Sequence, residues 1–299
     1  MKVKIPDDLK ADLPQNKWGK LLTATPIVMT VIATMLAGLS SSEMTRAQYD
    51  RSLAAQQQSK AGDQWSFFQA KRLRGAMQRS TLDLLQATTE IRPLNSSTLA
   101  QSSGELPPAV VVALEKSELP VAAATPAVDA NVKAALTALE GLKPEPEIAA
   151  LLVPVKEQTL AESLRTATGA TLALDAATKP VNQAIDQLEK KLAANSDKSL
   201  SRDFYAARLR YTATRYDAEA RLNQAVAYVY ELQVRKSNVS AERHHARSQQ
   251  FFYGMLAAQM AVIIATFAIA ARQRNLLWSI AAAAGLGAVI MAAYVYLFV

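Results

Sequence analysis

Residues 251–298 decide the fold. They contain two apolar runs, FFYGMLAAQMAVIIATFAIAA and LLWSIAAAAGLGAVIMAAYVYLF, separated by the short polar segment RQRN. A third apolar run, LLTATPIVMTVIATMLAGL, occupies residues 21–39. Each run has about 20 residues, which is the length that an α-helix needs to cross about 30 Å of hydrocarbon. The sequence therefore predicts three transmembrane helices, at residues 21–39, 251–271 and 276–298.

The chain between the first and second spans is polar by comparison. Residues 1–20 form a tail, and residues 40–250 form one extramembrane domain. Two stretches without proline, 41–92 and 197–250, predict long helices. The first of them either starts at a serine cap among residues 40–42 or continues the first span. We expect an all-α membrane protein with a long, antiparallel, coiled-coil-like helical pair outside the membrane.

The second long stretch carries apolar residues at seven-residue spacing on two opposite sides of a helix. A helix that is apolar on two sides is expected to lie between two neighbours. The first stretch has a seam of small residues, which bury little area each, so further helices, from this chain or from other copies, are needed to complete a core. The stripes of the second stretch are Phe204, Tyr211, Ala218, Ala225, Leu232 and Val239, and Ala206, Ala213, Ala220, Ala227, Val234 and Ala241; the seam of the first is Ala47, Ala54, Ala61 and Phe68.

Residues 93–194 form a proline-rich insert between the two long helices. Helical patches are expected at 127–142, 155–168 and 181–194, and irregular structure at 95–125. We expect the insert to be a tip that joins the far ends of the long helices.

Nothing in the sequence indicates a chemical reaction. The chain has no cysteine, no Gly-rich phosphate loop and no Gly-x-Ser-x-Gly elbow. Adjacent helical residues point about 100° apart, so His244 and His245 are poorly placed to bind one metal ion together. We expect them to be polar residues at the membrane interface, with a metal or proton role as the alternative. We predict no catalytic residue, cofactor or metal, and therefore no enzyme, although a site assembled within the insert is an open alternative.

Two groups of residues are candidate interaction sites. Trp65, Phe67, Phe68, Gln69 and Lys71 form the densest aromatic cluster outside the spans, and they either pack against the partner helix or contact another protein. Within the spans the candidates are a polar residue, which either bonds a neighbouring helix or lines a solute path, and two glycines that allow close helix packing. These span residues are Gln259, Gly285 and Gly287.

The positive-inside rule predicts the orientation. Lysines in the tail and Arg272 and Arg274 in the loop between the last two spans lie on one side of the membrane. This places the N-terminus in the cytoplasm and the central domain in the periplasm, although basic residues such as Arg46 and Arg243 also flank the spans on the outer side. Without the seven basic and three acidic residues of the tail and the loop, 26 basic and 23 acidic residues remain for the central domain, a small and scattered excess that argues against nucleic acid as a partner.

Around the aromatic cluster at residues 65–71, the chain resembles a family of bacterial membrane proteins of unknown function. The family motif is Trp-x-aromatic-aromatic-Gln-Ala-Lys, matched by Trp65 to Lys71. The similarity covers about residues 15–90 and 200–299 and departs in the long insert. The resemblance implies three spans, a helical pair and a bacterial inner-membrane location, and it brings no known activity.

The expected function is therefore that of a non-enzymatic membrane scaffold or accessory subunit. Its partners would be the lipid bilayer and either further copies of itself or a larger membrane complex, reached through the helical stalk. The alternative is an oligomeric pore or transport component with Gln259 near its axis.

Overall fold

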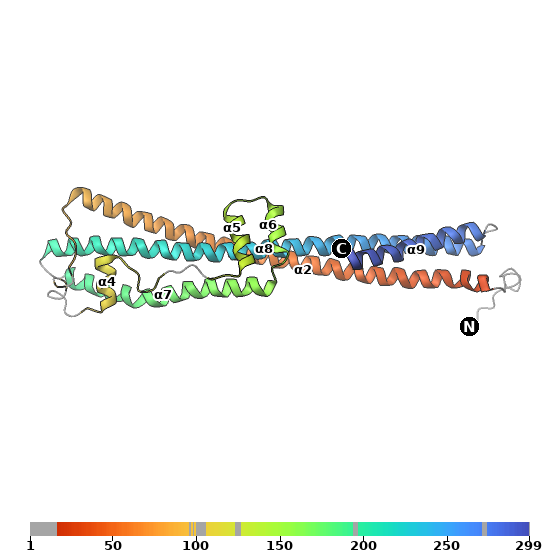
Figure 1. Ribbon diagram of the computed structural model, residues 1–299, viewed down its shortest axis with the longest axis horizontal. Helices are drawn as coiled ribbons and strands as arrows, with labels where there is room; N and C mark the ends of the chain where they lie inside the picture. Colours follow the sequence, from red (N-terminus) through yellow and green to blue (C-terminus); the bar gives the residue numbers. More distant parts are fainter. Residues whose placement is uncertain are drawn as a thin grey trace. The chain divides into compact units, whose positions relative to one another are not determined.

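The computed structural model describes residues 17–95, 97, 99, 106–122, 127–193, 197–270 and 274–298. Within these residues the chain forms α-helices and no β-strand, as the sequence predicted (Figure 1). The helices are α2 (Lys17–Thr88), α4 (Pro108–Lys116), α5 (Ala130–Glu140), α6 (Glu145–Leu152), α7 (Glu157–Ala193), α8 (Lys198–Ala270) and α9 (Arg274–Phe298).

The chain divides into two compact units. The first, which we call the membrane unit, comprises Met1–Leu53 and Ser237–Val299, and the second, the stalk, comprises Ala54–Lys236. Three helices, α2, α8 and α9, contain segments long and apolar enough to cross a membrane. The first long helix has no separate start, because α2 continues from the first span to Thr88. Of the two alternatives that the sequence left open, the continuous helix is the one adopted.

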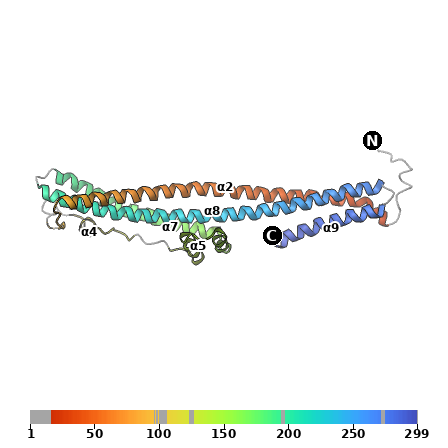
Figure 2. The ribbon, with the colours of Figure 1, turned by 90° about the horizontal axis from the view of Figure 1, so that it is seen from above.

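Small side chains allow the three apolar segments of the membrane unit to pack closely. Figure 2 shows α9 folding back beside α8. Ala258 of α8 and Ala288 of α9 are fully buried in a cluster that also holds Leu36 of α2. A Cβ placed on Gly254 would lie 3.3 Å from Leu36 Cδ1 and 3.7 Å from the Ala288 carbonyl oxygen. Close backbone approach of this kind is the usual way in which helices associate in lipid.

In the stalk, α7 runs antiparallel beside α8 and buries the first apolar stripe of α8 (Figure 1). Leu188 packs with Phe204 near one end, and Leu160 packs with Leu232 near the other. Between them Leu174 meets Ala218 and Leu222.

The second stripe of α8 faces α2. Its alanines Ala213, Ala220 and Ala227 are buried, and so is Ala61 in the seam of α2. A Cβ on Gly75 of α2 would lie 3.7 Å from the Ala213 carbonyl oxygen. The stalk portion of α8 therefore lies between α7 and α2, which confirms the sandwiched position that the two stripes predicted.

The insert differs from its prediction in three respects. Residues 95–125 were expected to be irregular, but they contain α4, whose Val110, Ala113 and Leu114 are buried in the core. The short helix α6 was not predicted, and the patches expected at 155–168 and 181–194 are parts of the single helix α7. Pro180 lies inside α7 without ending it, because burial of apolar residues on both sides of the proline against α8 outweighs its local cost.

The insert is also not a tip. The described helices of the insert pack along the side of α8, as the clusters shared by α4, α7 and α8 and by α5, α6, α7 and α8 show. Its placement supplies the additional helical surface that the small-residue seam between α2 and α8 required.

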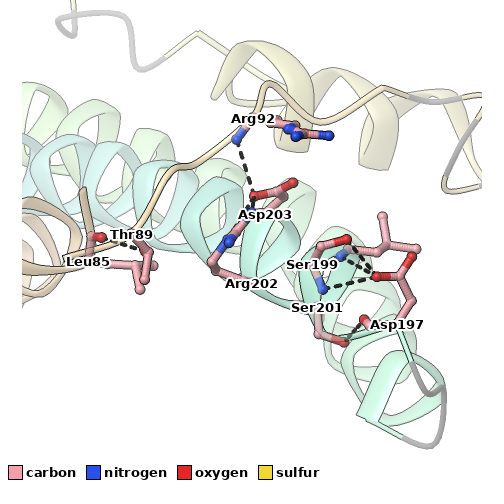
Figure 3. Close-up of polar contacts among 9 residues, drawn as sticks. Leu85, Thr89, Arg92, Asp197, Ser199, Ser201, Arg202 and Asp203 are labelled. Carbon is pink, nitrogen blue, oxygen red and sulfur yellow. Dashed lines mark hydrogen bonds and ion pairs between the residues drawn. The ribbon is translucent and has the colours of Figure 1, made fainter. Parts of the chain in front are cut away.

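A capped helix start and a buried carboxylate organise the end of the stalk where α8 begins (Figure 3). The sequence suggests a cap at residue 195 or 196, which lie outside the described residues. Asp197 is the observed cap, since its Oδ1 accepts hydrogen bonds from the backbone N–H groups of Ser199 (3.0 Å) and Leu200 (3.1 Å). Nearby, Asp203 Oδ1 accepts a bond of 3.2 Å from the Arg92 backbone N–H and so attaches the chain after α2 to α8.

Replacement of the cap, Asp197→Ala, is expected to loosen the first turn of α8. The hydrogen bond from the Ser199 hydroxyl, followed by that from the Leu200 N–H, lowers the pKa of Asp197 from its ordinary value of 3.8. Because the pKa is lowered in the folded state, the stabilisation is present above pH 3.8 and is lost as the pH falls through the lowered pKa. Hydrogen exchange at residues 199–201 should be faster in the variant at neutral pH and should converge with wild type in acid. A difference that persists at low pH would contradict the assignment.

Candidate functional site

The aromatic motif of α2 anchors α2 to α8 in the stalk. Trp65 Nε1 donates a hydrogen bond of 2.7 Å to Glu231 Oε1. The indole ring meets the rings of Phe68 and Tyr228 edge-on, with ring centroids 5.4 and 5.1 Å apart. Edge-on pairs of this kind add to the energy of burial. Of the two interpretations of the cluster, packing against the partner helix describes Trp65 and Phe68.

The contact made by Trp65 extends through α8 to α6. Glu231 also receives Arg235 Nη1 at 3.2 Å, and Arg235 Nε lies 3.1 Å from Glu145 Oε2. One turn of α8 therefore links α2 on one side to α6 on the other.

Lys71, about one and two-thirds turns after Trp65, joins a second polar group on α8. Its Nζ forms an ion pair with Glu219, which also lies 3.5 Å from Arg215 Nε. Both cations lie near the Tyr216 ring, with Lys71 Nζ 5.4 Å and Arg215 Cζ 4.8 Å from its centroid. Arg79 and Asp217 form a further ion pair between the same helices.

Phe67 and Gln69 are not part of this seam, because they point to solvent on the other sides of α2. Phe67 is 54% exposed, whereas Trp65 and Phe68 are only partly exposed. The structure thus separates the five predicted interaction residues into three that face α8 and two that do not.

A second regular stripe runs along α2 opposite the α8 face, and we call it the outer seam. Its large members are Leu73, Met77 and Leu84, which are 63%, 59% and 66% exposed. With three small residues they follow the alternating three- and four-residue spacing of a coiled-coil seam. The full set is Ala70, Leu73, Met77, Ser80, Leu84 and Ala87, all exposed. Sequence reasoning missed this stripe, although its spacing is a readable signal.

The predicted polar residue of the second span faces outward. Gln259 is exposed and lies in a groove of about 460 Å³ between α2 and α8. Thr30 and Thr34 line the same groove, and their hydroxyls donate to the carbonyls of Pro26 (2.8 Å) and Thr30 (2.9 Å). The Gln259 amide is therefore accessible from the outside of the membrane unit.

The two glycines of the third span have different surroundings. Gly285 is buried, and a Cβ there would overlap the Sδ of Met29, so this glycine allows α9 to approach α2. Gly287 is exposed, with no described atom within 4 Å of a Cβ built on it. Gly285 thus allows α9 to pack against α2 of the same chain, whereas Gly287 lies on the exposed side of α9.

His244 contacts carboxylates that the sequence did not associate with it. Its Nδ1 lies 2.5 Å from Glu43 Oε2, and its Nε2 lies 4.0 Å from Asp50 Oδ2. The Ser40 hydroxyl donates a bond of 2.9 Å to the Ser248 carbonyl beside this group. Among the described residues, no group of three or more His, Cys, Asp or Glu has the arrangement of a metal site. These contacts hold α2 to α8 within the membrane unit.

Comparison with known proteins gives one family. Residues 21–105 match the family described as "Domain of unknown function (DUF4337)". No curated protein and no solved structure matches the chain. The C-terminal residues included in the sequence resemblance lie outside the matched range. Over α2 and the segment that follows it, the chain is therefore similar to an uncharacterised family.

Proposed function

We propose that this protein is a non-enzymatic, membrane-anchored scaffold or accessory subunit that acts through its stalk. The observation that supports the proposal is the outer seam, which presents Leu73, Met77 and Leu84 to solvent at coiled-coil spacing. A regular apolar stripe on the free side of a helix marks a surface for another helix. We propose that the occupant is the same stripe on a second copy, with a larger membrane complex as the alternative partner.

Membrane insertion fixes the relative direction of two copies, so that the outer seam of one can pair with the outer seam of the other. Copies that insert with the same orientation leave the membrane at the same end of α2, so their α2 helices run in the same direction. Two parallel outer seams place identical residues opposite each other, as in a parallel coiled coil. The residues at the edges of the seam, Gln69, Arg74 and Asp83, then bring no like charges into direct contact at the usual pairing distance of five residues.

The outer seam is too small to hold two copies together by itself. Three large apolar side chains per copy cover much less than the roughly 1,200 Å² buried in a stable interface. Confinement to one membrane raises the effective concentration of the copies, which offsets a small contact area. The exposed Gln259 adds a second contact, since its amide both donates and accepts and can pair with the same residue of another copy.

We place the protein in the bacterial inner membrane with its N-terminus in the cytoplasm and its stalk in the periplasm. The basic tail and the Arg272 and Arg274 loop support this orientation. The resemblance to bacterial membrane proteins supports the compartment.

Charge in the outer seam is expected to separate the copies. The variant with Leu73→Asp and Met77→Asp should lose the oligomer in mild detergent, with self-association weakened at least about tenfold, because each aspartate replaces an apolar contact with buried charge. Native mass measurement should give an oligomer for wild type and a monomer for the variant. Gln86→Asp is the matched control, since Gln86 is exposed and lies about 180° around the helix from Met77. A wild-type monomer without partners would overturn the proposal.

An oligomeric pore is the second candidate, and it is favoured by the groove that contains Gln259, Thr30 and Thr34. These side chains supply polar groups at membrane depth, which a solute path requires. Solute flux into liposomes that is abolished by Gln259→Leu would support a pore. Absence of flux from liposomes that hold the oligomer would argue for the scaffold.

A further inference from the structure

The stalk contains a polar pocket that none of the contacts above explains. It has a volume of about 370 Å³ and lies where α2, α7 and α8 meet. This volume is in the range of small-molecule sites. Its polar lining includes Gln78 of α2, Asn182 of α7, and Tyr211, Thr212 and Arg215 of α8. No residue of the outer seam lines it, so the pocket is separate from the surface proposed for self-association.

Two buried polar atoms at this pocket have no hydrogen-bond partner among the described residues. Tyr211 is 1% exposed, and its hydroxyl is one of them. The other is Arg215 Nε, which lies 3.5 Å from Glu219 Oε1 but forms no hydrogen bond. Buried polar groups in folded proteins are almost always paired, so an unpaired hydroxyl and an unpaired N–H at one pocket indicate a missing acceptor.

The charges around the pocket differ between its two ends. Arg208 is held by two carboxylates, with Asp186 at 2.9 Å and Glu189 also in contact, so it is fully engaged. Arg215 shares the single carboxylate of Glu219 with Lys71, which leaves this end with an excess of positive charge. Arg208 and Arg215 are two turns apart on α8, or about 10 Å.

The protonation state of Tyr211 suits a hydrogen bond to an acceptor beside Arg215. Burial raises the pKa of the Tyr211 phenol, the Arg215 charge acts in the opposite direction, and the Glu219 carboxylate raises the pKa further. The phenol therefore keeps its proton at neutral pH and can donate a hydrogen bond. An oxygen acceptor placed between Tyr211 Oη and Arg215 Nε would satisfy both groups.

We propose that this pocket binds a small organic monocarboxylate. Its carboxylate would accept hydrogen bonds from Arg215 Nε and the Tyr211 hydroxyl, and the amides of Gln78 and Asn182 would hold polar groups on the remainder of the molecule. A single negative charge fits better than the double charge of phosphate, because Asp186 lines the pocket and would repel a dianion. The inference does not depend on the proposed self-association.

Binding can be measured calorimetrically on the full-length protein in detergent. The probes are acetate, lactate, butyrate and benzoate, with inorganic phosphate and glycerol for comparison. We expect at least one monocarboxylate to bind saturably and more tightly than phosphate or glycerol. Arg215→Gln and Tyr211→Phe should each weaken that binding at least about tenfold, an effect typical of losing a charge-assisted hydrogen bond. Tyr49→Phe is the control, since Tyr49 is 69% exposed and outside the pocket, and it should bind as wild type does.

Thermal unfolding of Tyr211→Phe without ligand provides a second readout. The substitution keeps the ring and removes an unpaired buried hydroxyl, so the variant should unfold at the same temperature as wild type or a higher one. The proposal is overturned if no monocarboxylate binds saturably, if phosphate or glycerol binds more tightly, or if both pocket variants bind as wild type does. A clear loss of stability in Tyr211→Phe would also count against it, because the hydroxyl would then already have a partner.

Discussion

Phe204→Ala is expected to lower the free energy of unfolding of the stalk by about 3–5 kcal/mol, the usual cost of truncating a buried phenylalanine. Phe204 is 2% exposed and belongs to the cluster in which α4, α7 and α8 meet. Truncation of the ring would leave a cavity in the cluster that also contains Leu188 and Leu192 of α7. Denaturant titration followed by far-UV circular dichroism measures the loss.

Leu172→Ala is the control for this prediction. Leu172 lies on α7 but is 65% exposed, so its truncation should change stability by no more than about 0.5 kcal/mol. Similar losses in both variants would contradict the placement of α7 against the first stripe of α8.

Trp65→Ala is expected to have the next largest effect, a loss of about 2–4 kcal/mol. The substitution removes edge-on contacts with Phe68 and Tyr228 and leaves Glu231 without its indole donor. Trp65→Phe should recover the part that comes from ring packing but not the part that comes from the hydrogen bond. The same denaturant titration separates the two contributions.

Phe67 provides a matched control within the same motif. It is 54% exposed and does not face α8, so Phe67→Ala should leave stability within about 0.5 kcal/mol of wild type. If Phe67→Ala were as destabilising as Trp65→Ala, the assignment of the α8-facing side of α2 would be wrong.

Features that depend on local pattern were predictable from the sequence. The three spans follow from the length of their apolar runs, and the two stripes of α8 predict that it lies between two neighbours without naming α7 as one of them. The outer seam was also predictable, because Leu73, Met77 and Leu84 keep coiled-coil spacing. The sequence prediction nevertheless identified only the small-residue seam on the other face of α2.

Features that depend on tertiary contacts were not predictable. A proline usually ends a helix, and Pro180 misled the prediction because the energy that keeps α7 continuous comes from α8. In α4, Pro108 is instead the first helical residue, a position that prolines favour, so this start could have been recognised.

To predict the clusters at His244 and Tyr211, one would need to know the register in which distant helices pack. His244 meets Glu43 across 201 positions of sequence. Regular alanine spacing allows several alignments of α2 on α8, and the sequence alone does not choose among them. The resemblance and the matched family indicate no partner for His244 or Tyr211, so the contacts of both residues emerged only from the packed structure.

Disulfide cross-linking in membranes tests the central claim, that the outer seam joins parallel copies of the stalk, most directly. The chain contains no cysteine, so each single-cysteine variant reports on one position alone. Leu73→Cys should give a covalent dimer under mild oxidation, because parallel seams place residue 73 of each copy side by side. Gln86→Cys, exposed on another side of α2, should give little. Equal yields at the two positions, or no dimer at position 73, would contradict the account.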